Sequence, residues 1–248
     1  MIRTLSFAAI VLTATAASAA PSANEVVDKV QQFYANIQHV TASFRQEVTN
    51  DMIGTTKSSD GTVWIMKPGK MRWDYLEKHN AAVEVKKSFI SNGASLWVVE
   101  HDNKQVIKKN LQQDLMPVAV SFLSGKGDLK TEFNAEIDPK SKLGSGSEIV
   151  LKLTPKKPSA QYKNLFLVVN PTDFHVSQSQ IVDSSNNTNR IHFFDPKFDK
   201  PVKDTWFEFD EHSVKNYRIV DADAQGSNAP PAGATDLGPP VSPLPRKP

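Results

Sequence analysis

The residues of this chain that could carry acid–base, nucleophilic or metal chemistry are its six histidines and its serines, because it has no cysteine. The histidines are widely separated, at His39, His79, His101, His175, His192 and His212. Without cysteine they cannot build a Cys–His zinc site, and no Gly-x-Ser-x-Gly, phosphate-loop or His-Glu-x-x-His motif is present. We therefore expect no enzyme, no metal and no cofactor. A hydrolase whose Ser–His triad assembles from distant positions is the alternative.

The residue types also allow binding of apolar ligands. The large apolar side chains suited to such binding are most frequent in residues 62–75. Two strand patterns flank Pro68-Gly69, and side chains alternate between faces along a strand. This alternation predicts one apolar wall made by five large side chains: Trp64, Met66, Met71, Trp73 and Tyr75. Methionine adapts to variable apolar ligands, although core packing explains the same pattern.

A helix and a long strand precede this hairpin and would position it. Ser22 and Glu25 form a Ser-x-x-Glu capping box, which predicts a helix start. Apolar residues then recur at helical spacing, at Val26, Val30, Phe33 and Ile37. From Val40 the period changes to two, with Phe44 on the apolar side. We expect an amphipathic helix that lies on the sheet.

Further strand patterns follow at hairpin intervals. They cover residues 83–91, 95–100, 105–109, 148–154, 162–170, 174–183, 190–194 and 205–209. Asn92-Gly93, between the first two, is the clearest hairpin signal in the chain. So many short strands with few helices predict a mainly β (α+β) fold, with one curved antiparallel sheet forming an incomplete barrel.

Residues 111–123 break the strand rhythm. Pro117 can start a helix, the residues after it, including Phe122, are almost all apolar, and Gly125 can end it. A short apolar helix between flexible connections is a candidate lid, and an ordinary buried connector is the alternative.

The two ends of the chain predict export and a tail. Residues 1–19 have the layout of a secretory signal peptide, residues 20–221 form the folded domain, and residues 222–248 are a disordered tail rich in proline. Of the 29 basic residues, Arg3 lies in the signal peptide, which leaves 28 against 27 acidic residues. A nearly neutral chain with scattered lysine pairs is not expected to bind nucleic acid.

Residues 61–75, which include Lys-Pro-Gly-Lys-Met-Arg-Trp-Asp-Tyr, resemble the periplasmic outer-membrane lipoprotein carrier protein family, LolA. Residues 41–46, 91–97 and 153–156 extend the resemblance, which covers roughly residues 23–221. It implies an incomplete barrel with helices as a lid over its open side. It also implies a periplasmic, monomeric chaperone that takes acylated lipoproteins from an inner-membrane ABC transporter to an outer-membrane acceptor.

In such a carrier the expected apolar cavity is lined by Phe44, Trp64, Met66, Met71, Trp73, Tyr75, Trp97 and Phe122. The family usually has an arginine before the motif's proline, where it is thought to latch the lid. Here that residue is Lys67, which keeps the charge without the five-donor fork of arginine. A sensor of the same fold, which binds lipidated or unfolded envelope proteins and signals, is the alternative function.

Overall fold

The structure, a computed structural model, describes residues 20–79, 82–110, 128–159 and 162–223. Outside these residues lie the predicted signal peptide, the candidate lid at 111–123 with Phe122, and the predicted tail from residue 224 onward. In the described part, no helix combines the length and the apolar character needed to cross a membrane.

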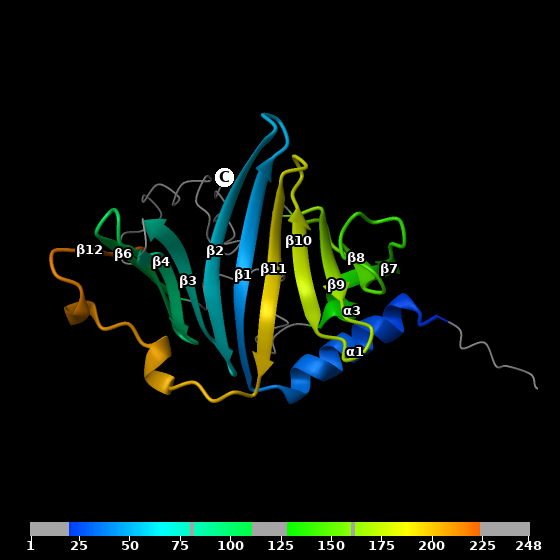
Figure 1. Cartoon of the computed structure of the whole chain (residues 1–248), viewed down its shortest axis with the longest axis horizontal. Helices are drawn as coiled ribbons and strands as arrows, with labels where there is room; N and C mark the ends of the chain where they lie inside the picture. Colours follow the sequence, from blue (N-terminus) through cyan, green and yellow to red (C-terminus); the bar gives the residue numbers. More distant parts are fainter. Residues whose placement is uncertain (1–19, 80–81, 111–127, 160–161, 224–248) are drawn as a thin grey trace, which may run out of the picture.

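The first described element is helix α1 (Ala23–Asn36), and its predicted capping box is confirmed. The backbone N–H of Glu25 donates to Ser22 Oγ at 3.3 Å, and the backbone N–H of Ser22 donates to Glu25 Oε2 at 2.7 Å. Two donors that a helix end would otherwise leave unpaired are thereby satisfied. The buried stripe of α1 packs on the sheet, as predicted, and consists of Val26, Val27, Val30 and Tyr34. In Figure 1, α1 runs below the lower end of the sheet.

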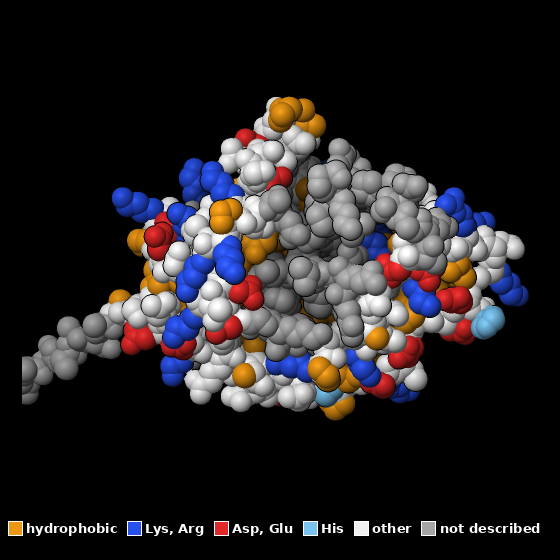
Figure 2. Space-filling view, turned by 180° about the vertical axis from the view of Figure 1, so that it is seen from behind, with side chains coloured by type: hydrophobic (Ala, Val, Ile, Leu, Met, Phe, Trp, Pro, Cys, Tyr) orange, Lys and Arg blue, Asp and Glu red, His pale blue; other side chains and the backbone are white. Residues whose placement is uncertain are grey.

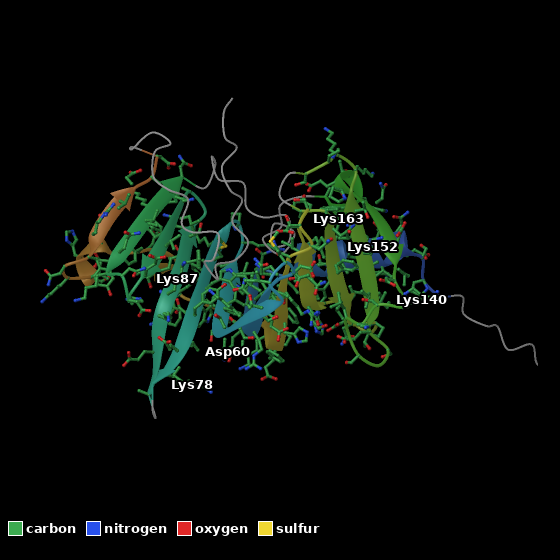
Figure 3. The ribbon with its side chains drawn as sticks, turned by 90° about the horizontal axis from the view of Figure 1, so that it is seen from above. Asp60, Lys78, Lys87, Lys140, Lys152 and Lys163 are labelled. Atoms are coloured by element: carbon green, nitrogen blue, oxygen red, sulfur yellow. The ribbon has the colours of Figure 1, made fainter. Side chains whose placement is uncertain are left out.

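The described strands form one twelve-stranded sheet in the order β12-β6-β5-β4-β3-β2-β1-β11-β10-β9-β8-β7. Their bounds are β1 His39–Asn50, β2 Thr55–Met66, β3 Lys70–His79, β4 Ala82–Asn92, β5 Ser95–Glu100, β6 Gln105–Asn110, β7 Phe133–Ile137, β8 Ile149–Pro155, β9 Asn164–Val169, β10 Val176–Val182, β11 Thr188–Phe198 and β12 Arg218–Asp221. A short helix, α3 (Leu129–Glu132), precedes β7. The sheet is strongly curved in Figure 3, and its edges β12 and β7 do not pair with each other. The predicted mainly β fold with an incomplete barrel is confirmed.

Alternate side chains of each strand divide between two faces of this sheet. The inner face carries the main apolar cluster, against which α1 packs, and includes Phe44, Trp73, Tyr75 and Phe89. The opposite face is the outer face, and it carries a second cluster that includes Trp97.

The outer face is crossed by residues 199–217, which we call the outer strap. The strap contains two 3-10 turns, η1 (Asp204–Phe207) and η2 (Glu211–Ser213), and leads into β12. The predicted strand at 205–209 is therefore wrong. A segment lying on a sheet face has no neighbouring strand to pair with, so its backbone bonds locally, as in the 3.0 Å bond from Trp206 N to Lys203 O.

Strand β12 adds to the edge of the sheet beside β6, and the two strands are parallel. All other strand pairs in the described sheet are antiparallel. Contacts continue past β12, since Ala222 N donates to Lys108 O at 3.0 Å and Asp223 Oδ2 accepts from Asn110 N. Two residues assigned to the tail by the sequence thus lie against the sheet. Strands β7 and β12 were not expected from the sequence.

Candidate functional site

The inner face contains a continuous group of aromatic rings at its centre. The ring centroid of Phe44 on β1 lies 5.0 Å from that of Trp73 and 5.0 Å from that of Tyr75, both on β3. The Tyr75 ring in turn lies 5.8 Å from Phe89 on β4. The rings meet edge to face, an arrangement that aromatic pairs favour. We call Phe44, Trp73, Tyr75 and Phe89 the inner aromatic cluster.

A glycine gives Phe44 its place in this cluster. A Cβ atom added at Gly61 on β2 would lie 2.4 Å from the Phe44 ring and 2.3 Å from the carbonyl oxygen of Asp74. Only glycine fits there, since real Cβ atoms essentially never approach other heavy atoms so closely. Gly61 was not selected as a site residue from the sequence. The available signal was a glycine inside a strand pattern, which often marks a close approach.

The prediction that Trp64 and Met66 share one apolar wall with Met71, Trp73 and Tyr75 is wrong. The register of β2 and β3 pairs Val63 with Trp73 and Ile65 with Met71, so odd-numbered residues of both strands face inward. Trp64 lies opposite Arg72 on the outer face, and Met66 shares that side of β2. The physical reason is that residues directly opposite each other point to the same side of a sheet, so the register alone decides which alternating set is inside.

Trp64 and Trp97 instead hold the outer strap. The ring centroid of Trp64 lies 5.0 Å from that of Trp206, and Trp97 packs on Phe209 at 6.4 Å between centroids. Trp97 belongs to the outer cluster because its cross-strand partner is Ile90, whereas the neighbouring Phe89 faces inward. Of the predicted cavity residues that the structure describes, the inner face brings together Phe44, Met71, Trp73 and Tyr75.

The inner face also carries an ion pair that the sequence analysis missed. Lys87 Nζ lies 3.2 Å from Glu100 Oε1, and both side chains are largely buried. The same ammonium lies 4.9 Å from the ring centroid of Phe89, close enough for a cation–π interaction. Lys87, labelled in Figure 3, was counted only as part of a scattered lysine pair. The signal was its position two residues before Phe89, which places both on one face of β4.

Lys67 lies at the lower end of the sheet and contacts α1. Its Nζ donates a hydrogen bond to the backbone carbonyl of Tyr34 in the last turn of the helix. The last turn of α1 contains no basic residue, so Lys67 places a positive charge at the negative end of the helix dipole. Burial lowers the pKa of the Lys67 ammonium, and the carboxylate of Asp199 opposes that shift. The expected contact of Lys67 with the candidate lid falls outside the described residues.

Tyr34 and Asp199 complete this junction. The hydroxyl of Tyr34 accepts a hydrogen bond from Val176 N at 3.0 Å, and burial raises the Tyr34 pKa, which keeps the phenol neutral. Asp199 Oδ1 accepts from the backbone N–H groups of Gln38 and His39 at 2.7 and 3.2 Å, bonds that lower its pKa. The junction therefore ties α1 to β1, β2, β10 and the end of β11.

The arrangement of titratable groups offers acid–base pairs but no metal site within the described residues, where no three His, Cys, Asp or Glu side chains could hold an ion. His101 Nδ1 lies 2.8 Å from the hydroxyl of Tyr217 in the outer strap, and burial lowers the pKa of this imidazole. On the outer face, Asp74 accepts from Arg72 Nε and from Ser88 Oγ at 2.9 and 2.7 Å. His101 and Arg72 contact the outer strap directly, since Arg72 Nη1 also donates to Trp206 O at 3.4 Å, and Asp74 holds Arg72 in place.

Comparisons with known proteins agree with this geometry. The chain is 28% identical to an outer-membrane lipoprotein carrier protein of Neisseria meningitidis over 182 residues, covering 73% of this chain and 80% of the relative. It is also 28% identical to that of Azotobacter vinelandii over 207 residues, covering 82% and 93%. An uncharacterized conserved protein from Thermus thermophilus has a similar fold, with a TM-score of 0.50, 10% identity, and coverage of 80% of this chain and 98% of that one.

The family described as "Outer membrane lipoprotein carrier protein LolA" matches residues 35–210. This range takes in β1 to β11, the inner aromatic cluster, Lys67 and the first half of the outer strap. It covers well over half of the 248 residues. The chain therefore belongs to the LolA family of outer membrane lipoprotein carrier proteins.

Proposed function

We propose that this protein is a periplasmic chaperone that binds the acyl chains of lipoproteins on its inner face. It takes this cargo from an inner-membrane ABC transporter and delivers it to an outer-membrane acceptor. The observation that carries the proposal is the continuous apolar inner face of an open, curved sheet, in a chain of the lipoprotein carrier family. The protein works as a non-enzymatic, monomeric carrier without a cofactor.

The need for such a face follows from the cost of exposing lipid to water. Each methylene transferred from an apolar environment to water costs about 0.8 kcal/mol, so two or three long acyl chains together cost tens of kcal/mol. A carrier must replace the bilayer with apolar side chains of its own. The rings of Phe44, Trp73 and Tyr75, with the flexible Met71 beside them, provide such a surface without demanding one cargo shape.

Loading requires the inner face to open. Trp73 and Phe44 are 0% and 2% exposed, so the side chains packed against them must separate before acyl chains can enter. Helix α1 packs on the same apolar cluster, and Lys67 fixes its C-terminal end to the hairpin between β2 and β3. We assign to α1 the role of one such covering element. We assign the bond from Lys67 to Tyr34 to the closed, empty state.

The transfer is non-covalent, and the transporter supplies the energy for loading. Release of the cargo then depends on the return of the covering elements, including α1, to the inner face. A charge-assisted hydrogen bond of about 1.5–3 kcal/mol, as at Lys67, is large enough to bias the closed state and small enough for cargo to overcome.

Native mass spectrometry of the protein purified from the bacterial envelope tests this function. We expect bound acylated polypeptide or acyl-chain mass on the parent protein. Reconstituted transfer from inner-membrane vesicles to an outer-membrane acceptor should then depend on the protein. Absence of both bound lipid and transfer would overturn the proposal. Turnover of ester substrates that one Ser substitution abolishes would support the hydrolase instead.

A further inference from the structure

The turn between β1 and β2 projects two large apolar side chains into solvent. Met52 is 89% exposed and Ile53 is 67% exposed, which makes them the most exposed large hydrophobic residues in the described part of the chain. They are adjacent, and together they form what we call the apolar tip. The β1–β2 turn lies at the top of the molecule in Figure 1, and Figure 2 shows a group of hydrophobic side chains exposed at that end.

The turn that presents the tip is held by hydrogen bonds. Ile53 N donates to Asn50 Oδ1 at 3.2 Å, and Asp51 N donates to Asn187 Oδ1 at 3.0 Å. Asn187 is fixed in turn, since its Nδ2 donates to Asp183 Oδ2 at 2.9 Å. Two neighbouring hairpins thus cooperate to hold a turn whose apolar side chains are largely exposed to solvent. Such an arrangement stabilises presentation of the side chains to a partner instead of their burial.

The shape and charge of the tip indicate which partner. A specific protein interface needs about 800 Å² from each side, far more than two side chains on a narrow turn can supply. A lipid bilayer needs no shape complementarity and gains from any apolar area that enters its interface. The tip lies between Asp51 and Gly54, and the uncharged side chains of Asn50 and Thr55 follow on either side. One acidic residue, Asp51, and one basic residue, Lys57, lie within four residues of the tip along the hairpin, so this end of the hairpin has no strong net charge.

We propose that the apolar tip inserts into the interfacial region of a phospholipid bilayer and docks the protein transiently on a membrane surface. The tip lies at the end of the β1–β2 hairpin opposite to Lys67, so docking leaves the junction with α1 free. This inference does not rest on the proposed lipoprotein transfer. Two side chains give weak binding, so the protein can leave the membrane again.

The absence of cysteine allows a site-specific test. Met52→Cys, labelled in the full-length protein with an environment-sensitive fluorophore, should show a blue shift with vesicles of phosphatidylethanolamine containing a minor fraction of phosphatidylglycerol. Val83→Cys is the matched control, because Val83 is 56% exposed on another strand. A depth-dependent quencher in the bilayer should quench only the label at position 52. Equal responses at both positions, or no response at position 52, would overturn the inference.

Flotation with the same vesicles supplies a second readout. The double substitution Met52→Ser and Ile53→Ser should reduce the bound fraction about tenfold, because binding scales with the apolar area that enters the bilayer. Its melting temperature should not change, since neither side chain is buried. Binding that high salt abolishes and the double substitution leaves intact would assign the contact to charges elsewhere. If the double variant still binds vesicles and instead fails to bind a partner protein, the tip is a protein-binding site and the proposal is overturned.

Discussion

Strand β3 makes different kinds of contact on its two faces, polar and directional on the outer face and aromatic on the inner face. Toward the outer face, Arg72 donates to Asp74 at 2.9 Å, and its guanidinium carbon lies 5.5 Å from the Trp206 ring centroid in the outer strap. Toward the inner face, Trp73 and Tyr75 meet other rings through edge contacts. Directional bonds specify one partner, and aromatic packing accepts several arrangements. The outer face is therefore built to keep one segment in place, and the inner face is suited to contacts that can be exchanged.

The strongest test of this difference compares two buried tryptophans, Trp73 on the inner face and Trp97 on the outer face. Truncation of a buried Trp to Ala costs about 3–5 kcal/mol, and Leu at either site should cost somewhat less because it fills part of the space. Trp73→Leu should in addition lower lipid capture about tenfold, which corresponds to about 1.4 kcal/mol. Denaturant unfolding and native mass spectrometry measure the two effects. Equal loss of capture in Trp97→Leu would show that the faces do not differ in function.

Gly61 provides a test confined to the inner face. Gly61→Ala should lower the free energy of unfolding by about 1–3 kcal/mol, because the new methyl group meets the Phe44 ring and the Asp74 carbonyl. Replacing Phe44 by Leu in the same chain removes part of the clash. The double variant should therefore lose less stability than the sum of the single changes, as a double-mutant cycle would measure. Strict additivity would mean that Phe44 does not set the cost at Gly61.

Lys67 tests whether the cover of the inner face is held by a bond that can be exchanged. Lys67→Leu should lower the free energy of unfolding by about 1.5–3 kcal/mol through loss of the charge-assisted bond to Tyr34 O. We expect this variant to accept lipoprotein and to transfer it poorly, because its cover returns less readily. Lys67→Arg, which restores the residue usual in the family, should transfer at least as well as the parent. Reconstituted transfer measures both, and normal transfer by Lys67→Leu would remove Lys67 from the mechanism.

The smallest expected effect is a pH dependence on the outer face. Burial lowers the pKa of His101, against the opposing carboxylates of Asp74 and Asp102, so the unfolded chain binds this proton more readily. The stability contributed here is complete above the unfolded pKa of about 6.5 and is lost as the pH falls through that value toward the lower folded pKa. His101→Gln should weaken this acid sensitivity.

Thermal melts at pH 5 and 7 would measure the His101 effect. The difference between parent and variant should be smaller than the about 2–4 °C that 1 kcal/mol produces in a domain of this size. A residual slope is expected in the variant, because burial also lowers the pKa of His192. An unchanged slope would show that His101 does not couple the outer strap to pH.

Local signals in the sequence determined many of the elements of this fold, although not β7, β12 or the turns of the outer strap. The Ser22–Glu25 capping box sets the start of α1, and Asn92-Gly93 joins β4 to β5, where Gly93 has a φ of +95° and Asn92 Oδ1 accepts from the N–H groups of Ala94 and Ser95. Each signal needs only neighbours within a few residues, so the sequence alone is enough to place it. The mainly β class follows from the number of such strands and turns.

Tertiary structure decided which side of each strand faces inward. Alternation along β2 and β3 defines two sets of side chains, but only the pairing of Val63 with Trp73 puts Trp64 on the outer face, away from the inner aromatic cluster. Likewise, only the completed sheet shows that residues 205–209 have no strand beside them and must turn, and that β12 returns to β6. The physical reason is that a shift of one residue in register leaves the local sequence pattern of each strand unchanged. The same shift moves every side chain of the strand to the other face of the sheet.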